Sequence, residues 1–249
     1  IVFHCASPAS PKAYSAQPFS TFASNTLGLQ YLCLTLKKQD SYLKSKFFFF
    51  STTGVYGKHP SSHYPLHETT QSFLSPTDPK SIYVVSKIAG EQLLSHASCL
   101  HSFTSYILRL NINYGPGIDL TDGRALSDFL NDARSGRDIQ LRTPGTQKRN
   151  YLYLVDAVRA IFMLLNKVHL PCTVNLSHHE DTTVLELASL ISTLYGVNVK
   201  VPEYSLAHSG IDYDQTSVDC ENLCSLTGWS PKVDLRTGLG RLAFSLDSE

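Results

Sequence analysis

The chain has 249 residues, 42% of them hydrophobic, which is enough to bury one large core or two smaller ones. Its 21 lysines and arginines balance 21 aspartates and glutamates, so it carries no basic field that would hold a nucleic acid. No apolar run approaches the roughly 20 residues needed to cross a bilayer, and we expect neither a nucleic-acid nor a membrane partner.

The cysteines and histidines show no pattern typical of a metal site. Six cysteines are scattered along the chain, and the ten histidines include the adjacent pair His178 and His179, whose side chains point apart in a helix or a strand. No H-E-x-x-H or comparable ligand spacing occurs, so we expect no metal. Reduced, mostly buried thiols favour a cytoplasmic location.

The first half of the chain alternates short apolar runs with helical stretches, as crossover units on a parallel sheet do. The expected strands are Ile1 to Phe3, Phe47 to Phe50 and Tyr106 to Leu110, and the expected helices are Pro18 to Lys38 and Ser81 to His96. The second strand ends in the small polar stretch Ser51-Thr52-Thr53-Gly54, at the carboxyl edge where open parallel sheets bind ligands.

The second half is predicted to contain three further helices and two short strands. Residues 60 to 79, rich in Ser, Pro, His and Thr, precede the Ser81 helix as a surface loop. The later helices are expected near Ala125 to Ser135, Val155 to Lys167 and Val184 to Tyr195, and the strands near Ile139 to Leu141 and Thr173 to Leu176.

A pair of side chains on the Ser81 helix suggests proton chemistry. Tyr83 and Lys87 are four residues apart, so on a helix they share one face. A nearby ammonium stabilises a phenolate and makes tyrosine a usable general base. The spacing alone is typical of many solvated helix faces. The small residues of this helix and the hydroxyl of Thr52 at the preceding strand end favour the catalytic interpretation.

Several motifs in fixed order resemble the extended short-chain dehydrogenase/reductases, and within them the NAD-dependent nucleotide-sugar epimerases and dehydratases. The resemblance rests on segments that span nearly the whole chain: Ser51-Thr52-Thr53-Gly54-Val55-Tyr56-Gly57, Tyr83-x-x-x-Lys87, Arg109-Leu110-x-x-x-Tyr114-Gly115-Pro116-Gly117, Asp122-Gly123-Arg124, Arg149-Asn150-Tyr151 and Gly228-Trp229-Ser230-Pro231.

The resemblance implies a role for each matching residue. Tyr83 would be the base, Lys87 would tune it and hold the nicotinamide ribose, and Thr52 would bind the sugar hydroxyl being oxidised. It further implies contacts to NAD from Cys5, Ala6, Ser7, Asn25 and Ser51, and contacts to the nucleotide sugar, expected to be UDP-linked, from Thr53, Asn111, Arg124 and Arg149. Arg149 would pair with the diphosphate. The alternative interpretation is that Arg149 is an ordinary surface arginine.

Two departures from the family leave the second chemical step open. Ala6 to Pro11 and the Asp122-Gly123-Arg124 stretch resemble the UDP-glucuronate decarboxylases, but Gly54 stands where that branch has a glutamate. Ile112, between Asn111 and Asn113, stands where the family has a substrate-binding asparagine. Without the carboxylate, epimerisation or simple oxidoreduction is favoured over decarboxylation.

The expected fold is α/β, a Rossmann-like parallel sheet truncated at its N-terminus with a smaller C-terminal substrate-binding part. Residues 1–115 would be the remainder of the NAD-binding domain with the catalytic helix, and residues 116–249 mainly the substrate-binding part. No G-x-G-x-x-G turn occurs, which leaves a catalytically inactive fragment as a further alternative. By analogy with the family, the helices 18–38 and 81–96 are predicted to form a homodimer.

Overall fold

The computed structural model of the protein describes residues 1–37, 45–60, 63–75, 77–78, 81–101, 103–202 and 216–248. Lys38, the last residue of the first expected helix, and parts of the expected loop over residues 60–79 lie outside the described residues.

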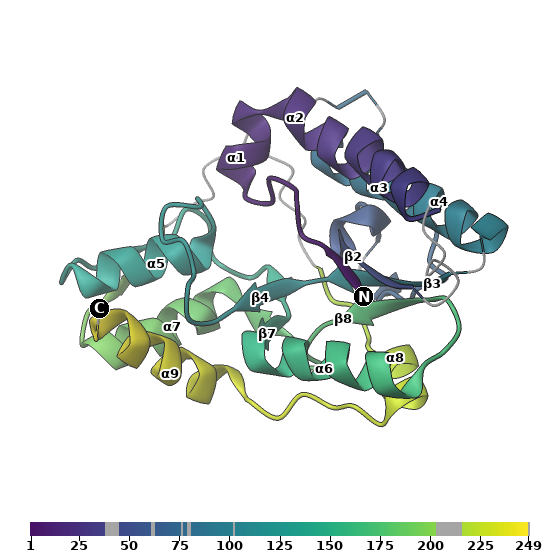
Figure 1. Ribbon diagram of the computed structural model, residues 1–249. Coiled ribbons are helices and arrows are strands. Elements are labelled where there is room, and N and C mark those ends of the chain that lie inside the picture. Colours follow the sequence, from purple (N-terminus) through teal and green to yellow (C-terminus); the bar gives the residue numbers. More distant parts are fainter. Residues whose placement is uncertain are drawn as a thin grey trace.

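A four-stranded parallel sheet lies at the centre of the molecule (Figure 1). Its order is β1-β2-β3-β8, built from β1 (Val2–His4), β2 (Lys46–Thr52), β3 (Thr104–Leu110) and β8 (Cys172–Leu176). The predicted parallel α/β fold is therefore confirmed. In the register of the sheet, Ser51 lies opposite Arg109, and Arg109 lies opposite Asn175, so these residues form one row near the carboxyl edge.

Helices cover both faces of the sheet. On one face lie α1 (Pro11–Ala16), α2 (Pro18–Ala23), α3 (Leu29–Lys37) and α4 (Ile82–His101), and on the other lie α6 (Leu154–Lys167) and α8 (Glu221–Thr227) (Figure 1). The alternation of side chains along β2 explains this arrangement, because Phe47 and Phe49 pack into the core beneath α3 and α4 while Phe48 packs into the core with α6. Four consecutive phenylalanines thus serve two cores.

The expected helix from Pro18 contains a π turn, η1 (Ser24–Gly28), between α2 and α3. This turn carries Asn25, which is completely buried. A short helix that the sequence did not predict, α1, precedes it; Ser10 caps this helix by accepting a hydrogen bond from the Ala13 amide at 3.2 Å.

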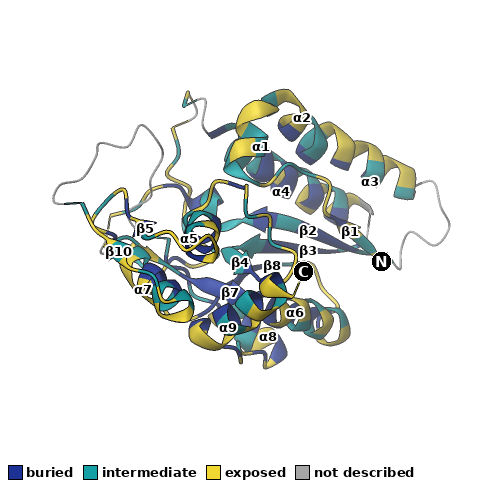
Figure 2. Cartoon of the chain, turned by 90° about the vertical axis from the view of Figure 1, so that its left-hand side faces the viewer, coloured by how far each residue is buried: buried dark blue, intermediate teal, exposed yellow. Residues whose placement is uncertain are grey.

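A second group of elements packs beside the sheet around its own core (Figure 2). Its helices are α5 (Ala125–Arg134), α7 (Val184–Tyr195) and α9 (Leu235–Asp247). Its short strands form three pairs, β4 (Ile112–Tyr114) with β7 (Tyr151–Tyr153), β5 (Ile139–Gln140) with β10 (Val199–Lys200), and β6 (Lys148–Arg149) with β9 (Thr182–Thr183). The chain returns from this region to the central sheet through α6 and β8, so the division after residue 115 stays a prediction.

In the described part of the chain no helix is long and apolar enough to cross a bilayer. The six cysteines are all free thiols. The described residues contain no group of three His, Cys, Asp or Glu side chains that could hold a metal ion.

Candidate active site

The end of β2 meets α4 at the residues that the sequence indicates as catalytic. The hydroxyl of Thr52 lies beside the Tyr83 phenol. One helical turn further on, the Nζ of Lys87 donates to the carbonyl oxygen of Phe50 at 2.6 Å. Thr52 also accepts from the Gly54 amide at 3.2 Å, because it caps the 3-10 turn η3 (Thr53–Tyr56). The structure therefore brings the three predicted catalytic residues to one point on the carboxyl edge of the sheet.

The Tyr83 phenol lies in a desolvated position. Burial raises its pKa to about 12, the positive charge of Arg124 opposes that rise, Tyr14 adds to it, and the hydrogen bond from Thr52 opposes it. Tyr14 stacks on Tyr83 with ring centroids 4.9 Å apart. In the free protein Tyr83 is thus a neutral phenol, and it needs positive charge nearby to become a base.

Lys87 is only 3% exposed. Burial lowers its pKa to about 8, while the nearby Cys5 and Glu91 raise it. Its Nζ lies 4.9 Å from the ring centroid of Phe49 and 5.7 Å from that of Tyr83. An ammonium with a pKa in this range changes its charge close to physiological pH, beside the phenol that it is expected to tune.

Gly90 allows α4 to lie close to the sheet and to the π turn. A Cβ at this position would lie 2.6 Å from Cζ of Phe49 and 2.8 Å from the backbone oxygen of Asn25. This close approach explains why the small residues of α4 matter for the position of Tyr83 and Lys87.

The residues expected to contact NAD lie around the same edge. The Nδ2 of Asn25 donates to Ser7 Oγ and to Ser86 Oγ, both at 2.9 Å, and so connects the loop after β1 with α4. The Oδ1 of Asn25 is buried and has no hydrogen-bond partner among the described residues. Cys5 and Ala6 are exposed in the loop after β1, and Ser51 is buried beneath Thr52.

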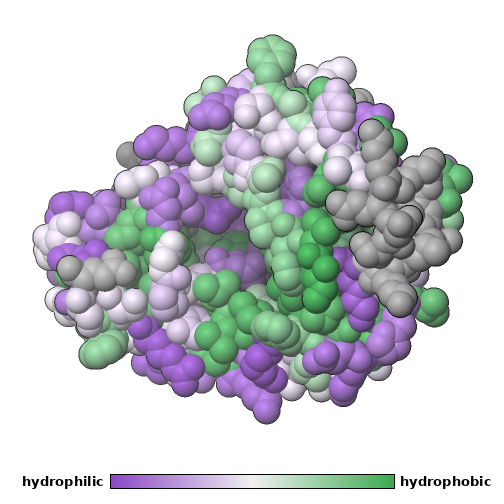
Figure 3. Space-filling view, viewed as in Figure 1, coloured by the Kyte–Doolittle hydropathy of each residue, from purple (hydrophilic) through white to green (hydrophobic). Residues whose placement is uncertain are grey.

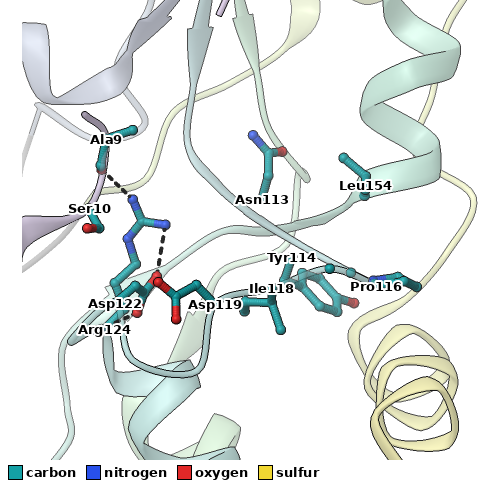
Figure 4. Close-up of a pocket in the computed structure, with 12 residues that line it drawn as sticks. Ala9, Ser10, Asn113, Tyr114, Pro116, Ile118, Asp119, Asp122, Arg124 and Leu154 are labelled. Atoms are coloured by element: carbon teal, nitrogen blue, oxygen red, sulfur yellow. Dashed lines mark hydrogen bonds and ion pairs between the residues drawn. The ribbon is translucent and has the colours of Figure 1, made fainter. Parts of the chain in front are cut away.

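A cleft of about 320 Å³ lies beside this edge, between the loop after β1 and the segment that follows β4 (Figure 4). Arg124 crosses it, donating to the Ala9 carbonyl oxygen at 2.8 Å and pairing with Asp122 at 3.4 Å. Asn113 also lines this cleft, and its Oδ1 is buried without a hydrogen-bond partner in the described structure. Arg124 is therefore both a wall of the cleft and the charge that acts on Tyr83.

A larger cleft of about 730 Å³ lies next to it, lined by α5, by residues 140–143 and by Arg124, Gln147 and Arg149. Polar side chains gather in a hollow on this face of the molecule (Figure 3). Arg149 projects from β6, and its Nη1 donates to the Lys148 carbonyl oxygen at 2.8 Å. Three arginines, Arg124, Arg142 and Arg149, line this cleft together with Asp128, which pairs with Arg142 at 3.5 Å, and the two other guanidinium groups suit an anionic ligand.

Two of the residues expected to bind substrate lie apart from these clefts. Asn111 donates to the Thr216 carbonyl oxygen at 2.8 Å and to Asn150 Oδ1 at 3.0 Å, and it lines neither cleft. Thr53, in η3, also lines neither. The role of Asn111 as a substrate ligand stays a prediction, and Asn113 has the better position for it.

The family model for the NAD-dependent epimerase/dehydratase family matches residues 1–176. The chain belongs to this family. It is 29% identical over 238 residues to UDP-glucuronic acid decarboxylase 6 of Arabidopsis thaliana, an alignment that covers 96% of this chain and 67% of that protein. It is 28% identical over 240 residues to UDP-glucuronic acid decarboxylase 1 of Xenopus tropicalis, covering 96% of this chain and 55% of the relative.

Solved structures of epimerases share the fold of this family member. The UDP-glucose 4-epimerase of Thermotoga maritima, solved with UDP-glucose, superimposes with a TM-score of 0.84 at 26% identity, covering 99% of this chain and 76% of the epimerase. The UDP-glucose 4-epimerase of Thermus thermophilus, solved with NAD, gives a TM-score of 0.81 at 25% identity, covering 98% of this chain and 76% of that one.

The described residues fit the cofactor of this family at its reactive end. The buried, unpartnered Oδ1 of Asn25 needs a donor, and the polar row of Ser7, Tyr83 and Lys87 lies at the edge where such sheets bind ligands. These four residues would hold the nicotinamide end of NAD, which when bound supplies the acceptor for hydride.

The sequence did not indicate that four further residues contribute to the geometry of this site. They are Tyr14, Glu91, Arg109 and Asn113. Glu91 had a usable signal, because it continues the series Tyr83, Lys87, Glu91 at a spacing of four on one helix face. Tyr14 gave no signal, because it lies in the short helix α1 and reaches Tyr83 only through the tertiary fold.

Proposed function

We propose that this family member oxidises a hydroxyl of a UDP-linked sugar to a ketone. The observation that carries the proposal is the meeting of Thr52, Tyr83 and Lys87 at the carboxyl edge of the sheet. A tyrosine beside a second hydroxyl can bind an alcohol with that hydroxyl and take its proton.

The residues would act in a defined order. Thr52 and Tyr83 would hold the sugar hydroxyl, and Lys87 and Arg124 would supply the positive charge that lets Tyr83 lose its proton. The phenolate of Tyr83 would then take the hydroxyl proton, and NAD, held by Ser7, Asn25, Tyr83 and Lys87, would supply the acceptor for the hydride from the same carbon. One C–H and one O–H bond are broken, and a C=O bond is formed.

The larger cleft is the proposed site for the nucleotide diphosphate. Arg124 and Arg149 both line it, and guanidinium groups bind phosphate oxygens with two parallel hydrogen bonds. The cleft adjoins the smaller one, since Arg124 borders both, and the charge of this arginine acts on Tyr83. The names of the relatives, UDP-glucuronic acid decarboxylases and UDP-glucose 4-epimerases, support a UDP sugar.

For the second step we propose epimerisation, with decarboxylation of UDP-glucuronate as the second candidate. The relatives favour decarboxylation. Against it, Gly54 follows directly on Thr52 and Thr53 and offers no carboxylate at the strand end. A reaction that returns hydride to the opposite face of the ketone needs no such group.

The experiment is to incubate the protein and NAD with UDP-glucose and with UDP-glucuronate, and to follow the sugar products by NMR and the release of carbon dioxide. Tyr83→Phe should lower turnover by at least about 100-fold. Tyr31→Phe, which removes the hydroxyl of an exposed tyrosine on α3, is the matched control and should retain activity. Equal turnover of Tyr83→Phe and the wild type would refute the proposal.

A chain that binds nucleotide sugar without NAD is the non-catalytic alternative. It is favoured by the absence of a G-x-G-x-x-G turn from this sequence. Equilibrium dialysis of the protein with labelled NAD separates the two. NAD binding would contradict this alternative, and binding of UDP-glucose without NAD binding would support it.

We also propose a homodimer that pairs α2, α3 and α4. Large apolar side chains are exposed along α2, the π turn η1 and α3, among them Phe19 at 90%, Leu27 at 54% and Tyr31 at 68%. An exposed apolar face of this kind is typical of an association surface. Light scattering at micromolar concentration should give twice the monomer mass, and Phe19→Asp should reduce it to the monomer mass.

A further inference from the structure

A buried network of polar side chains lies directly behind the proposed catalytic residues. Glu91 is 7% exposed on α4 and accepts two hydrogen bonds from Arg109, Nε to Oε1 at 3.1 Å and Nη2 to Oε2 at 2.8 Å. It also accepts a hydrogen bond of 2.5 Å from the hydroxyl of Ser51. This carboxylate therefore has a fixed orientation, held from two strands.

The network extends across the sheet along the row that Ser51, Arg109 and Asn175 form. The Nη1 of Arg109 donates to the hydroxyl of Tyr56 at 3.1 Å, and that hydroxyl donates to Asn175 Oδ1 at 2.5 Å. Every polar atom named here has a partner, so the network forms a rigid base under the carboxyl edge.

The strand end and the helix are joined by three consecutive residues of β2. Phe50 accepts from Lys87, Ser51 donates to Glu91, and the Thr52 hydroxyl lies beside Tyr83. The three helix residues are spaced by four and lie on one face of α4. Glu91 is thus the third member of a series whose first two members have the proposed catalytic roles.

We propose that Glu91 is a positioning residue that keeps the ammonium of Lys87 charged and directed at the strand end, with Arg109 and Ser51 fixing its carboxylate. This inference rests on the proposed function of Tyr83 and Lys87. Glu91 contacts neither sugar nor cofactor in this scheme and acts through Lys87.

The charges that face Lys87 agree with this role. Glu91 on the same helix and Cys5 in the loop after β1 raise its pKa against the effect of burial. His4 on β1 also faces it, and the Lys87 charge contributes to lowering the pKa of this imidazole, after burial. Among these groups Glu91 is the one whose orientation is fixed by three hydrogen bonds.

Arg109 has the complementary task of holding Glu91 as a carboxylate in a buried position. Burial opposes the charge of Arg109 itself, yet its hydrogen bonds and ion pair with Glu91 raise its pKa above the ordinary value. The pair is neutral as a whole. Its negative end is the one that acts on Lys87.

The test measures the pKa of Lys87 directly, without turnover. Protein labelled with ¹³C at lysine Cε is titrated by NMR, with the Lys87 resonance identified by its loss in Lys87→Met. Glu91→Gln should lower the Lys87 pKa by about 1. The alkaline limb of the plot of kcat/KM against pH should move to lower pH by the same amount, and kcat should change more than KM.

A second variant protects the test against misfolding. Glu91→Gln with Arg109→Gln removes both charges, so no buried guanidinium is left unpaired, and it should lower the Lys87 pKa as well. Asp247→Asn is the matched control, because it breaks the exposed Arg134–Asp247 pair and should leave the Lys87 pKa unchanged. An unchanged Lys87 pKa in a folded Glu91 variant overturns the proposal, and so does failure of both Glu91 variants to fold.

The proposed function and the role of Glu91 can be refuted separately. If the wild type shows no Tyr83-dependent turnover but the Lys87 pKa responds to Glu91, only the proposed function is refuted. If turnover depends on Tyr83 and the Lys87 pKa ignores Glu91, only the role of Glu91 is refuted.

Discussion

The Nζ of Lys87 donates to the carbonyl oxygen of Phe50 at 2.6 Å, so the ammonium lies under the strand end rather than in solvent. This hydrogen bond satisfies one donor of a buried cation, but burial still lowers its pKa from 10.5 to about 8. The difference corresponds to about 3 kcal/mol that the folded state loses by keeping the charge at neutral pH.

The pH dependence of stability should show this cost. Because the unfolded chain keeps the Lys87 proton up to about pH 10.5 and the folded chain only up to about pH 8, the contribution of Lys87 to the unfolding free energy rises with pH between these values. Lys87→Met should abolish that rise and be more stable than the wild type at pH 7. Urea unfolding at several pH values checks this, with the exposed Lys12→Met as control; parallel curves for wild type and Lys87→Met would contradict it.

The position of Gly54 offers a test of the second chemical step. Gly54→Glu restores a carboxylate at the strand end, and we expect it to increase carbon dioxide release from UDP-glucuronate by about 100-fold. A Cβ at this position would lie 3.1 Å from Cγ2 of Val84, so the effect should be larger when Val84→Ala is added. Gly54→Ala introduces the same Cβ without the carboxylate and should not release carbon dioxide. No gain in either Glu variant would show that the missing carboxylate does not determine the reaction.

The long elements of the sheet could be predicted from the sequence because one physical signal dominates each of them. The four phenylalanines Phe47 to Phe50 can only be buried in a central strand, and the structure extends that strand to Lys46–Thr52. The short strands near Ile1 to Phe3 and Ile139 to Leu141 were predicted, but others, such as Tyr151–Tyr153, were not, since their pairing depends on partners distant in the sequence. The π turn at Ser24–Gly28 likewise follows from the packing of Asn25, which no local pattern reveals.

The residues of the candidate site likewise divide into those that the sequence could predict and those that depend on the tertiary fold. Tyr83, Lys87 and Thr52 were found because their spacing and their place at a strand end have a chemical reason. Asn111 and Asn113 could not be told apart, because both side chains point to the interior and only the tertiary fold decides which of them lines the cleft.

The close approach of α4 to the sheet should depend on Gly90. Gly90→Ala places a Cβ 2.6 Å from the ring of Phe49, which packs in the core beneath α3 and α4. The substitution should therefore lower the unfolding free energy by about 1–3 kcal/mol. Because the helix would move away from β2, turnover should fall as well. Gly240→Ala is the matched control, since no atom lies within 4 Å of that Cβ in α9, and alanine there should stabilise the helix by up to about 1 kcal/mol. Equal melting temperatures for the two variants would contradict the packing argument.

Asp156 should be the strongest single support of the chain's C-terminal part. It is 1% exposed in the first turn of α6, and its Oδ2 accepts from the backbone amides of Lys232 at 2.9 Å and Val233 at 2.8 Å. Its Oδ1 forms an ion pair with Arg159, and its carbonyl oxygen accepts from the Trp229 indole at 3.0 Å.

Asp156→Ala would leave the buried amide of Val233 and the partly buried amide of Lys232 without an acceptor, at about 1–3 kcal/mol for each group. We therefore expect a loss of about 2–5 kcal/mol in unfolding free energy, measured by urea denaturation. Asp132→Asn, which breaks the exposed pair with Arg137, should cost less than about 1 kcal/mol. Because the residues that Asp156 anchors lead into α9, which packs with α5 and α7 beside the larger cleft, Asp156→Ala should also weaken binding of the nucleotide sugar. Retention of full stability would mean that the two amides find other acceptors, and the anchoring role would be refuted.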